Sequence, residues 1–479
     1  MLSFCNLVNE MITTVILDLS KLPDKAMIID MRCAAYELTN NQGFQWGYFA
    51  IIKRVIIIQF CLPLLVLGAQ PISFFAHYMP WFQTPGYSHT GWTHWGDTIP
   101  NQTSHYAPLI GLYDSRDPNV LEYQVLEMKY AGLDGLLMDW YGINDSLPEY
   151  GAQPIFQVLA KAGLKFGVVW EDRYAASQGG ATPVLQFIEN NFFNTSNYLT
   201  VSGHPVLLAW QTTYLDGNTW LSDMNSVSFK NKPILCTRDT ALGPGAEGAF
   251  SWINAGGGAA LAIPSLNNFL NHSYAYMIPT AFPRYNDDYS GFSYGSIADQ
   301  NGQMFMNTFV DCITSGNSII QIATWNDWQE GTIIEPSVEF QYRDLDSIQS
   351  MRKKYIDPTF FFTPDNLQLP DRLFRARRQA TSSVAHLDSV SDALFDGNPS
   401  LAEEILDNKS TGVIFTRFQT PVFGVHPGTV VYDVMGRKIR SFDLSHSTMK
   451  DYPRGLTSGL YIIDKNDGAA LEHFIVSDH

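Results

Sequence analysis

Gly135-Leu136-Leu137-Met138-Asp139-Trp140 is an apolar run that ends in a carboxylate and an aromatic ring. A short, nearly continuous apolar run is typical of a parallel strand that is buried on both faces of a sheet. Helical spacing precedes the run over residues 120–130 and follows it over residues 156–162. The order helix, strand, helix predicts an α/β fold.

The same alternation extends along the chain from residue 72. It predicts further strands at residues 72–78, 166–171, 205–210, 233–236, 249–253, 276–280 and 318–325, and helices at 184–190 and 304–314. Eight parallel strands separated by helices predict a (β/α)8 TIM barrel, a fold that commonly takes about 250 residues. A doubly wound open sheet is the alternative, but the sequence has no Gly-rich phosphate loop after any of these strands.

The composition narrows the choice of partners. The 479 residues carry a net charge of -17 and have a pI of about 5.0, so the surface repels phosphate backbones and nucleic acid is excluded as a partner. The chain contains 11 Trp and 23 Tyr, whose rings stack on the apolar faces of sugars while their polar tips donate hydrogen bonds. Many of these rings are also expected in the core.

The N-terminal region contains a predicted secretory signal at residues 51–69. Lys53-Arg54 form its basic start, an apolar run follows, and Leu67-Gly68-Ala69 places the mature N-terminus at Gln70. A membrane anchor is the alternative, although the run is short and interrupted. We interpret residues 1–50 as a mis-annotated extension upstream of the true start. We therefore expect secretion, with the product outside the cell or on an outer-membrane surface.

Cysteine and histidine spacing predicts neither a metal site nor a cofactor. Beyond the predicted signal only Cys236 and Cys312 remain, and they form either one disulfide or two buried thiols. His77, His89 and His94 lack the usual spacing of metal ligands.

Three predicted strands end in polar or aromatic residues: Asp139-Trp140-Tyr141, Glu171-Asp172 and Trp325-Asn326-Asp327. The carboxyl ends of barrel strands surround the active site, so this pattern predicts an enzyme. A carboxylate at a strand end can also cap the next helix. Three such groups beside Trp or Tyr favour the active site.

Asp327 and Glu330 are the predicted catalytic pair. Hydrolysis of a glycosidic bond requires one carboxyl group that protonates the leaving oxygen and a second that assists attack on the sugar. Trp325 and Trp328 flank the pair and would exclude water, which raises the pKa of a carboxyl group. The alternative is a capping box, in which Asn326 or Asp327 caps a helix that has Glu330 near its third position.

Trp325-Asn326-Asp327-Trp328-Gln329-Glu330-Gly331-Thr332, followed by Glu335-Pro336, resembles the signature of glycoside hydrolase family 99, which reads Asn-Glu-Trp-His-Glu-Gly-Thr with a later Glu-Pro. His77-Tyr78-Met79-Pro80-Trp81-Phe82 resembles the first-strand motif of that family, with Trp92 and Trp95 downstream. Residues 134–142 resemble the second-strand motif. The resemblance covers about residues 72–378.

This resemblance implies a (β/α)8 barrel and endo-acting attack on α-mannosides. In the family mechanism, one carboxylate removes the proton of the sugar 2-hydroxyl to form an epoxide-like intermediate, a role that falls on Asp327. The second carboxyl is acid and then base, a role that falls on Glu330. The family has Glu at the position of Asp327 and His at that of Gln329. Trp325, Asn326, Asp327 and Glu330 instead match Trp-Asn-Asp-Tyr-Gly-Glu of the inverting α-1,3-glucanases of family 71.

Further side chains at or near the strand ends are predicted to bind the sugar. They are Tyr78, Trp81, Trp95, Asp139, Trp140, Tyr141, Glu171, Asp172, Tyr285, Trp325, Asn326, Trp328 and Glu335. Asn286, Asp287 and Asp288 are candidates of the same kind. Structural ion pairs with Arg173 or Arg284 are the alternative for the acidic residues among them.

The predicted domains are the barrel at 70–378, a helical packing or linking segment at 379–410, and a small C-terminal β-sandwich-like domain at 411–479. Val431-Tyr432-Asp433-Val434-Met435-Gly436-Arg437-Lys438 and Gly459-Leu460-Tyr461 resemble the sorting domain of the type IX secretion system, which implies contact with that export machinery. A small carbohydrate-binding domain is the alternative, but residues 411–479 contain no Trp.

Three functions remain open from the residues alone. The favoured one is a monomeric hydrolase of an α-linked oligo- or polysaccharide, either α-mannan or α-1,3-glucan. The others are a non-catalytic glycan-binding protein on the same barrel and a surface adhesion protein. The presence of both Asp327 and Glu330 favours the hydrolase.

Overall fold

The computed structural model describes residues 71–85, 92–95, 104–143, 146–210, 215–289, 292–380 and 385–407, together with four strands between residues 430 and 476. The predicted extension at 1–50 and signal at 51–69 lie outside the described residues. Within the described residues, no helix is long and apolar enough to cross a membrane.

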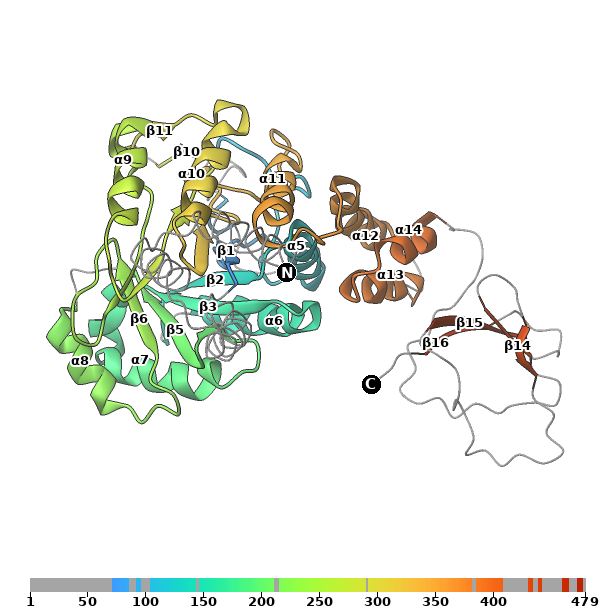
Figure 1. The fold of residues 1–479 in the computed structure, drawn as a ribbon, viewed down its shortest axis with the longest axis horizontal. Helices are drawn as coiled ribbons and strands as arrows, with labels where there is room; N and C mark the ends of the chain where they lie inside the picture. Colours follow the sequence, from blue (N-terminus) through green and yellow to red (C-terminus); the bar gives the residue numbers. More distant parts are fainter. Residues whose placement is uncertain are drawn as a thin grey trace, which may run out of the picture. The chain divides into compact units, whose positions relative to one another are not determined.

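A parallel sheet forms the centre of the fold (Figure 1). Its parallel strands, in spatial order, are β8 (Tyr276–Ile278), β7 (Gly248–Phe250), β6 (Ile234–Arg238), β5 (His204–Ala209), β3 (Lys165–Trp170), β2 (Gly135–Trp140), β1 (Ser73–Tyr78), β12 (Ile319–Ile322) and β9 (Thr280–Ala281). The short β4 (Thr200–Val201) pairs with β5 in the antiparallel sense. All eight predicted strands are confirmed, and they are apolar because both faces of the sheet are covered.

Segment 276–281 brings the two ends of the sheet together. Its first part, β8, pairs with β7, and its second part, β9, pairs with β12. Pro279 lies between them; it has no N–H to donate, but its carbonyl accepts a hydrogen bond from the Gln321 amide at 2.9 Å. The strands therefore form a nearly closed barrel, as predicted, and the open-sheet alternative is wrong.

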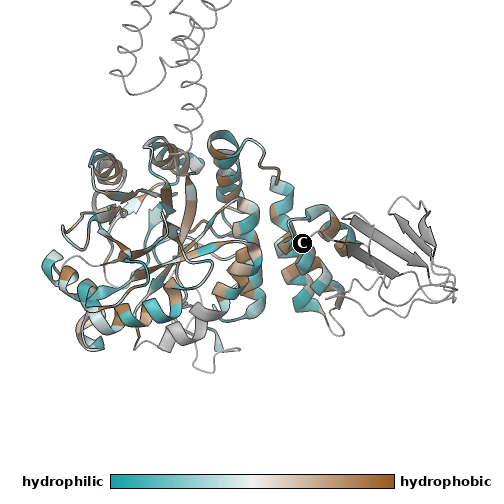
Figure 2. Cartoon of the chain, turned by 60° about the horizontal axis from the view of Figure 1, so that its bottom comes forward, coloured by the Kyte–Doolittle hydropathy of each residue, from teal (hydrophilic) through white to brown (hydrophobic). Residues whose placement is uncertain are grey.

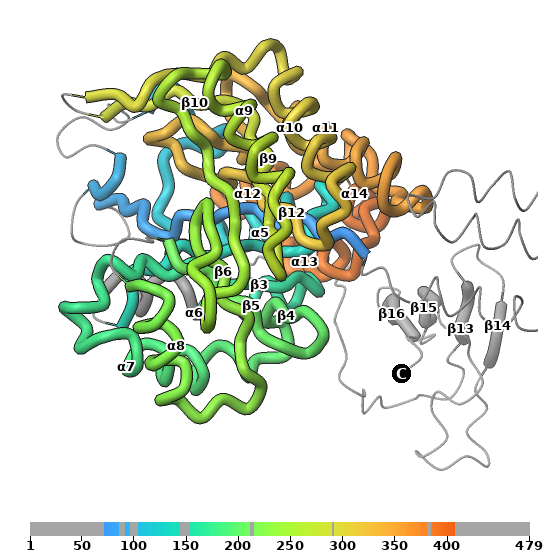
Figure 3. The backbone as a smooth tube through the Cα atoms, turned by 60° about the vertical axis from the view of Figure 1, so that its left-hand side comes forward, coloured from blue at the N-terminus to red at the C-terminus, as the bar shows by residue number. Residues whose placement is uncertain are grey.

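Helices cover the outside of the barrel. They are α5 (Pro118–Ala131), α6 (Ser146–Ala162), α7 (Ala181–Ile188), α8 (Gly217–Ser226), α9 (Ala259–Leu270), α10 (Gln303–Thr314) and α11 (Arg343–Met351). Figure 3 shows α7 and α8 outside β3, β5 and β6. Helix α5 begins where Asp117 accepts a hydrogen bond from the Asn119 amide and ends at Gly132, whose φ of 85° suits glycine.

One helix of a complete (β/α)8 pattern is missing. Residues 239–247, between β6 and β7, form a turn in which the Leu242 amide donates to the Ala246 carbonyl at 3.0 Å. Gly243 and Gly245 have φ values of 93° and 90°, which are incompatible with a right-handed helix. The expectation of eight strand–helix units is thus corrected at this position.

Shorter elements complete the connections. They are η1 (Asp172–Gln178), η2 (Glu189–Phe193), η3 (Ala255–Gly257), η4 (Gln300–Gly302), η5 (Arg352–Ile356), η6 (Pro364–Leu367), and the antiparallel pair β10 (Tyr285–Asn286) and β11 (Ser296–Ile297). Figure 2 shows hydrophobic residues on the central strands and on the helix faces turned toward them. The core therefore lies between the barrel and its ring of helices.

Three helices follow the barrel: α12 (Gln368–Gln379), α13 (Ala385–Phe395) and α14 (Pro399–Asp407). The predicted apolar face of residues 387–394 is buried at Leu387, Val390, Ala393 and Leu394. Farther along, β13 (Val430–Asp433), β14 (Lys438–Ser441), β15 (Gly459–Asp464) and β16 (Glu472–Val476) form one antiparallel sheet in the order β14-β13-β15-β16. The described strands form a single layer, so the second layer of the predicted sandwich stays a prediction.

Candidate active site

A cleft of about 870 Å³ lies over the carboxyl ends of the barrel strands. The residues that line it follow β1, β2, β3, β5, β6, β7 and β12, as expected for the active-site face of a barrel. Seven of the predicted site residues line this cleft: Trp81, Asp139, Tyr141, Glu171, Tyr285, Asp327 and Glu330.

Asp327 and Glu330 lie in a tight turn after β12. The Asp327 amide donates to Thr324 Oγ1 at 2.8 Å, and Asp327 Oδ1 accepts from the Glu330 amide at 2.9 Å. The second bond is the capping interaction considered as the alternative to catalysis, but residues 327–334 form no helix. Both carboxyl groups line the cleft. Asp327 therefore caps its own turn and faces the cleft at the same time.

Their surroundings give Asp327 and Glu330 different pKa values. Burial raises the pKa of Asp327 to about 6, and hydrogen bonds from the turn oppose this rise. Burial and the negative charge of Asp327 raise the pKa of Glu330 to about 8. Tyr289 lowers the pKa of Glu330 through its hydroxyl, which donates to Glu330 Oε1 at 2.9 Å. Asp327 is therefore the more acidic member of the pair, and Glu330 is the member that keeps its proton to higher pH.

A second acidic group lies in the cleft at the ends of β2 and β3. Glu171 forms an ion pair with Arg173 at 2.9 Å, and Asp139 Oδ2 lies 3.6 Å from His77 Nε2. Burial lowers the pKa of His77 to about 4, so its ring is neutral. Burial raises the pKa of both Asp139 and Glu171, and the charge of Arg173 opposes that rise. The ion pair with Arg173 that we considered as the alternative to sugar binding therefore exists, and its partner Glu171 lies in the cleft.

Four predicted binding residues instead form a buried network behind the turn that holds Asp327 and Glu330. Gln124 Nε2 donates to Glu335 Oε1 and the Tyr113 hydroxyl to Glu335 Oε2, each at 2.7 Å. The remaining bonds are from the Tyr78 hydroxyl to Gln124 Oε1 at 2.8 Å, and from Asn326 Nδ2 and Trp328 Nε1 to the Tyr113 hydroxyl at 3.2 Å. Tyr78, Asn326, Trp328 and Glu335 therefore do not line the cleft.

Asn326 also joins the turn of Asp327 and Glu330 to the end of β1. Its Oδ1 accepts from the Met79 amide at 2.8 Å, and its Nδ2 donates to the Met79 carbonyl at 2.9 Å. Asn326 thus pairs with both polar groups of one backbone residue. This pairing fixes the position of Asp327, the next residue along the chain.

The other four predicted binding residues also lie outside the cleft lining. Trp95 is fully buried, and its Nε1 donates to the Tyr113 carbonyl at 2.7 Å. Trp140 packs on Phe187, because consecutive strand residues face opposite sides and its neighbour Asp139 faces the cleft. Trp325 and Asp172 are fully buried.

The cleft contains residues that the sequence analysis did not select. The main ones are His94, Trp210, Arg238, Asp239, Trp252, Tyr289 and Tyr294. Trp210 follows β5, Arg238 ends β6, and Trp252 lies two residues after β7. The strand-end rule that selected Asp139 would have found these three, but the predicted strand at 233–236 ended too early to include Arg238.

Segment 285–288 is held against the turn of Asp327 and Glu330 by backbone hydrogen bonds. The Asn286 amide donates to the Glu330 carbonyl at 2.9 Å, and the Asp288 amide to the Gln329 carbonyl at 3.0 Å. Asp287 Oδ1 accepts from Ser293 Oγ and Oδ2 from the Tyr294 amide, each at 2.6 Å. Both carboxylate oxygens of Asp287, a candidate sugar ligand, therefore accept hydrogen bonds from its own loop.

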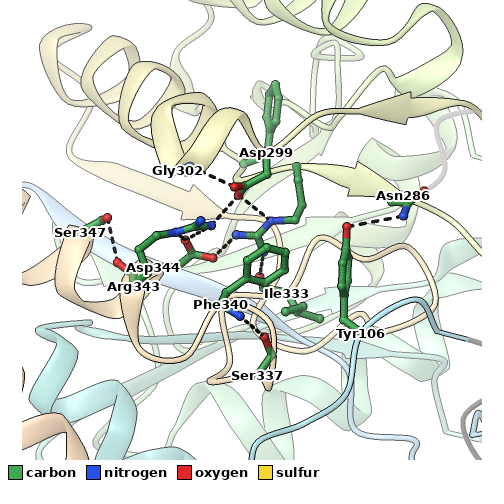
Figure 4. A network of polar contacts seen from close by, with 12 residues as sticks. Tyr106, Asn286, Asp299, Gly302, Ile333, Ser337, Phe340, Arg343, Asp344 and Ser347 are labelled. Carbon is green, nitrogen blue, oxygen red and sulfur yellow. Dashed lines mark hydrogen bonds and ion pairs between the residues drawn. The ribbon is translucent and has the colours of Figure 1, made fainter.

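Arg284 is buried beneath this segment. Its guanidinium donates to Asp299 at 3.0 Å, to the Ile333 carbonyl at 2.5 Å and to Asp344. Figure 4 shows Asp299, Arg343 and Asp344 joined in this network, with Ile333 and Phe340 beside them. The predicted alternative of an Arg284 ion pair with Asp287 or Asp288 is wrong. Its partners lie near the starts of α10 and α11.

Cys236 and Cys312 are buried free thiols, so the alternative of a disulfide between them is wrong. Among the described side chains, no group of three or more His, Cys, Asp or Glu residues is arranged to hold a metal ion.

No family model matches the chain. The chain is similar to the glycoprotein endo-alpha-1,2-mannosidase of Rattus norvegicus, with 22% identity over 318 residues that cover 56% of this chain and 69% of that protein. For the Xenopus laevis enzyme of the same name the identity is 22% over 311 residues, which cover 54% and 69%. The chain is thus homologous to these mannosidases at low identity.

Two solved structures are also similar. The GH99 endo-alpha-mannosidase from Bacteroides thetaiotaomicron has a TM-score of 0.49 and 19% identity, over 64% of this chain and 99% of that one. A glycoside hydrolase-like protein has a TM-score of 0.40 and 13% identity, over 59% and 94%.

Proposed function

We propose that this protein is a glycoside hydrolase that cleaves α-mannosidic bonds within a glycan. The observation that carries the proposal is the pair Asp327 and Glu330, which share one cleft wall and differ in pKa. Paired carboxyl groups with opposite protonation states are what glycoside hydrolysis requires. Homology to endo-alpha-1,2-mannosidases supports mannose as the sugar.

The first step uses Asp327 as a base and Glu330 as an acid. The Asp327 carboxylate removes the proton from the sugar 2-hydroxyl, and that oxygen bonds to the anomeric carbon as the glycosidic bond breaks. The proton of Glu330 moves to the leaving oxygen. In the second step the Glu330 carboxylate takes a proton from water, which opens the three-membered ring, and Asp327 returns its proton to the 2-oxygen. This sequence leaves both carboxyl groups as they began.

The test measures reducing-end release by the full chain on α-mannan and on α-1,3-glucan. Release from α-mannan alone supports the proposal. Release from α-1,3-glucan alone, with an inverted product seen by NMR, would replace it with the water-based route, in which Asp327 activates water instead. No release from either polymer would count against hydrolysis of both.

We expect a bell-shaped dependence of kcat/KM on pH, with a maximum near pH 7. Activity falls below about pH 6, where Asp327 gains a proton and stops acting as a base. It falls above about pH 8, where Glu330 loses the proton that it must donate. Initial rates at low substrate concentration across pH 4–10 measure this profile, because kcat/KM reports the free enzyme.

The variant Tyr289→Phe identifies the group responsible for the alkaline limb. It removes the hydroxyl that stabilises ionised Glu330, so the alkaline limb should move to higher pH while the acid limb stays near pH 6. An alkaline limb that does not move would contradict the assignment of Glu330 as the acid.

We also propose that the signal at residues 51–69 directs export of the protein. We propose further that a type IX secretion system recognises residues 411–479. The support is the basic-apolar-small pattern of the signal and the sorting-domain resemblance. Sequencing the N-terminus of the mature protein should give Gln70. An exported protein that still contains residues 51–69 would contradict cleavage at this signal.

A further inference from the structure

Three aromatic side chains form a surface cluster beside Glu330: Tyr289, Phe292 and Tyr294, here called the aromatic platform. Tyr289 and Phe292 stack with ring centroids 5.2 Å apart and an angle of 7° between their planes. Tyr294 meets Tyr289 edge-on at 5.6 Å and Phe292 edge-on at 5.3 Å. Phe292 and Tyr294 are 56% and 55% exposed. Rings of this size are usually buried, so their shared exposure needs an explanation.

The loop that carries the platform is held at both of its ends. It connects β10 and β11, which pair through Tyr285 with Ile297 and Asn286 with Ser296. Asp287 accepts hydrogen bonds from Ser293 Oγ and from the Tyr294 amide, so its carboxylate holds residues 293 and 294 in place. The rings are therefore held in place before any ligand binds, which lowers the entropic cost of binding.

The platform is also joined directly to the catalytic acid. Tyr289 donates its hydroxyl to Glu330 Oε1, and both Tyr289 and Tyr294 line the cleft. An acid that protonates the leaving oxygen lies beside the sugar that departs. The platform therefore lies on the leaving-group side of the bond that is cleaved.

We propose that the aromatic platform binds the first sugar of the leaving group by stacking on its apolar face. The inference rests on the proposed hydrolase function and adds to it a binding surface with defined chemistry. The C–H groups of one pyranose face contact the rings, and its hydroxyls stay in water. The occupant is a neutral sugar, because the platform consists of aromatic rings and contains no Lys or Arg that would pair with an anionic group.

The test compares two substrates that share the same donor sugars but differ in the leaving group. One is an α-linked manno-oligosaccharide, and the other is the matching α-glycosyl fluoride, whose leaving fluoride cannot stack. Phe292→Ala and Tyr294→Ala should each lower kcat/KM for the oligosaccharide by about 3- to 10-fold more than for the fluoride. Equal losses on both substrates would overturn the proposal. The matched control is Phe361→Ala, since Phe361 is a similarly exposed ring, 64% exposed, that does not belong to the platform.

A binding measurement separates failure of the platform from failure of the proposed function. Isothermal titration of the oligosaccharide into Asp327→Asn, with and without Phe292→Ala and Tyr294→Ala together, requires no turnover. If the two changes weaken binding at least tenfold, the platform is supported. This holds even if the wild-type protein hydrolyses neither substrate, because the missing hydrolysis refutes only the proposed hydrolase function. Unchanged binding overturns the platform whatever the activity.

Discussion

Glu330→Gln should lower kcat on the natural polymer by about 10³-fold, because the amide cannot donate the proton that the leaving oxygen requires. The amide oxygen still accepts the hydrogen bond from Tyr289, so the loop should keep its shape. Steady-state rates of reducing-end release measure the loss. Asp327→Asn should cause a loss of similar size for a different reason, since the neutral amide cannot remove a proton but still accepts the Glu330 amide bond.

The two variants differ on a substrate whose leaving group needs no acid. In a single turnover, Glu330→Gln should slow fluoride release from the α-glycosyl fluoride much less than it slows cleavage of the polymer. Asp327→Asn should slow the reaction of both substrates. Asp239→Asn is the control, because Asp239 is another cleft carboxylate whose side chain is 60% exposed. A loss for Asp239→Asn as large as for Glu330→Gln would contradict the assignment of the catalytic pair.

Arg284→Met should lower the free energy of unfolding by about 3 to 5 kcal/mol. The change removes the partner of Asp344, which is only 3% exposed and would remain as a buried charge. Arg343 lies 2.5 Å from Asp299 and 3.2 Å from Asp344 and compensates in part, which favours the lower end of that range. Denaturant unfolding followed by tryptophan fluorescence measures the change.

Two further variants define the origin of this effect. Arg284→Met combined with Asp344→Asn should recover much of the loss, because no unpaired charge is then buried. Lys161→Met breaks an ion pair with Asp392 whose side chains are 40% and 30% exposed, and should cost less than about 1 kcal/mol. If Arg284→Met costs no more stability than Lys161→Met, the buried network of Arg284 does not stabilise the fold as we propose.

The barrel could be predicted from the sequence because its cause is local. Strands buried on both faces must be apolar along their whole length, and the covering helices must be apolar on one side. The strand-end rule also located Asp139, Glu171 and Asp327 on the cleft, since parallel strands end at the same face. The missing helix between β6 and β7 was signalled by the local run Gly243-Pro244-Gly245, which the pattern of apolar runs does not weigh.

The sequence by itself determined the fold class, the active-site face and the carboxylates that meet there. Only the tertiary structure decided which motif residues face the cleft and which support it from behind. Asn326 pairs with Met79, 247 residues away, and Glu335 bonds to Gln124, 211 residues away. No local pattern reports such contacts, because a polar side chain beside a strand end can satisfy its hydrogen bonds either with a sugar or with buried protein groups. The three-dimensional packing makes that choice.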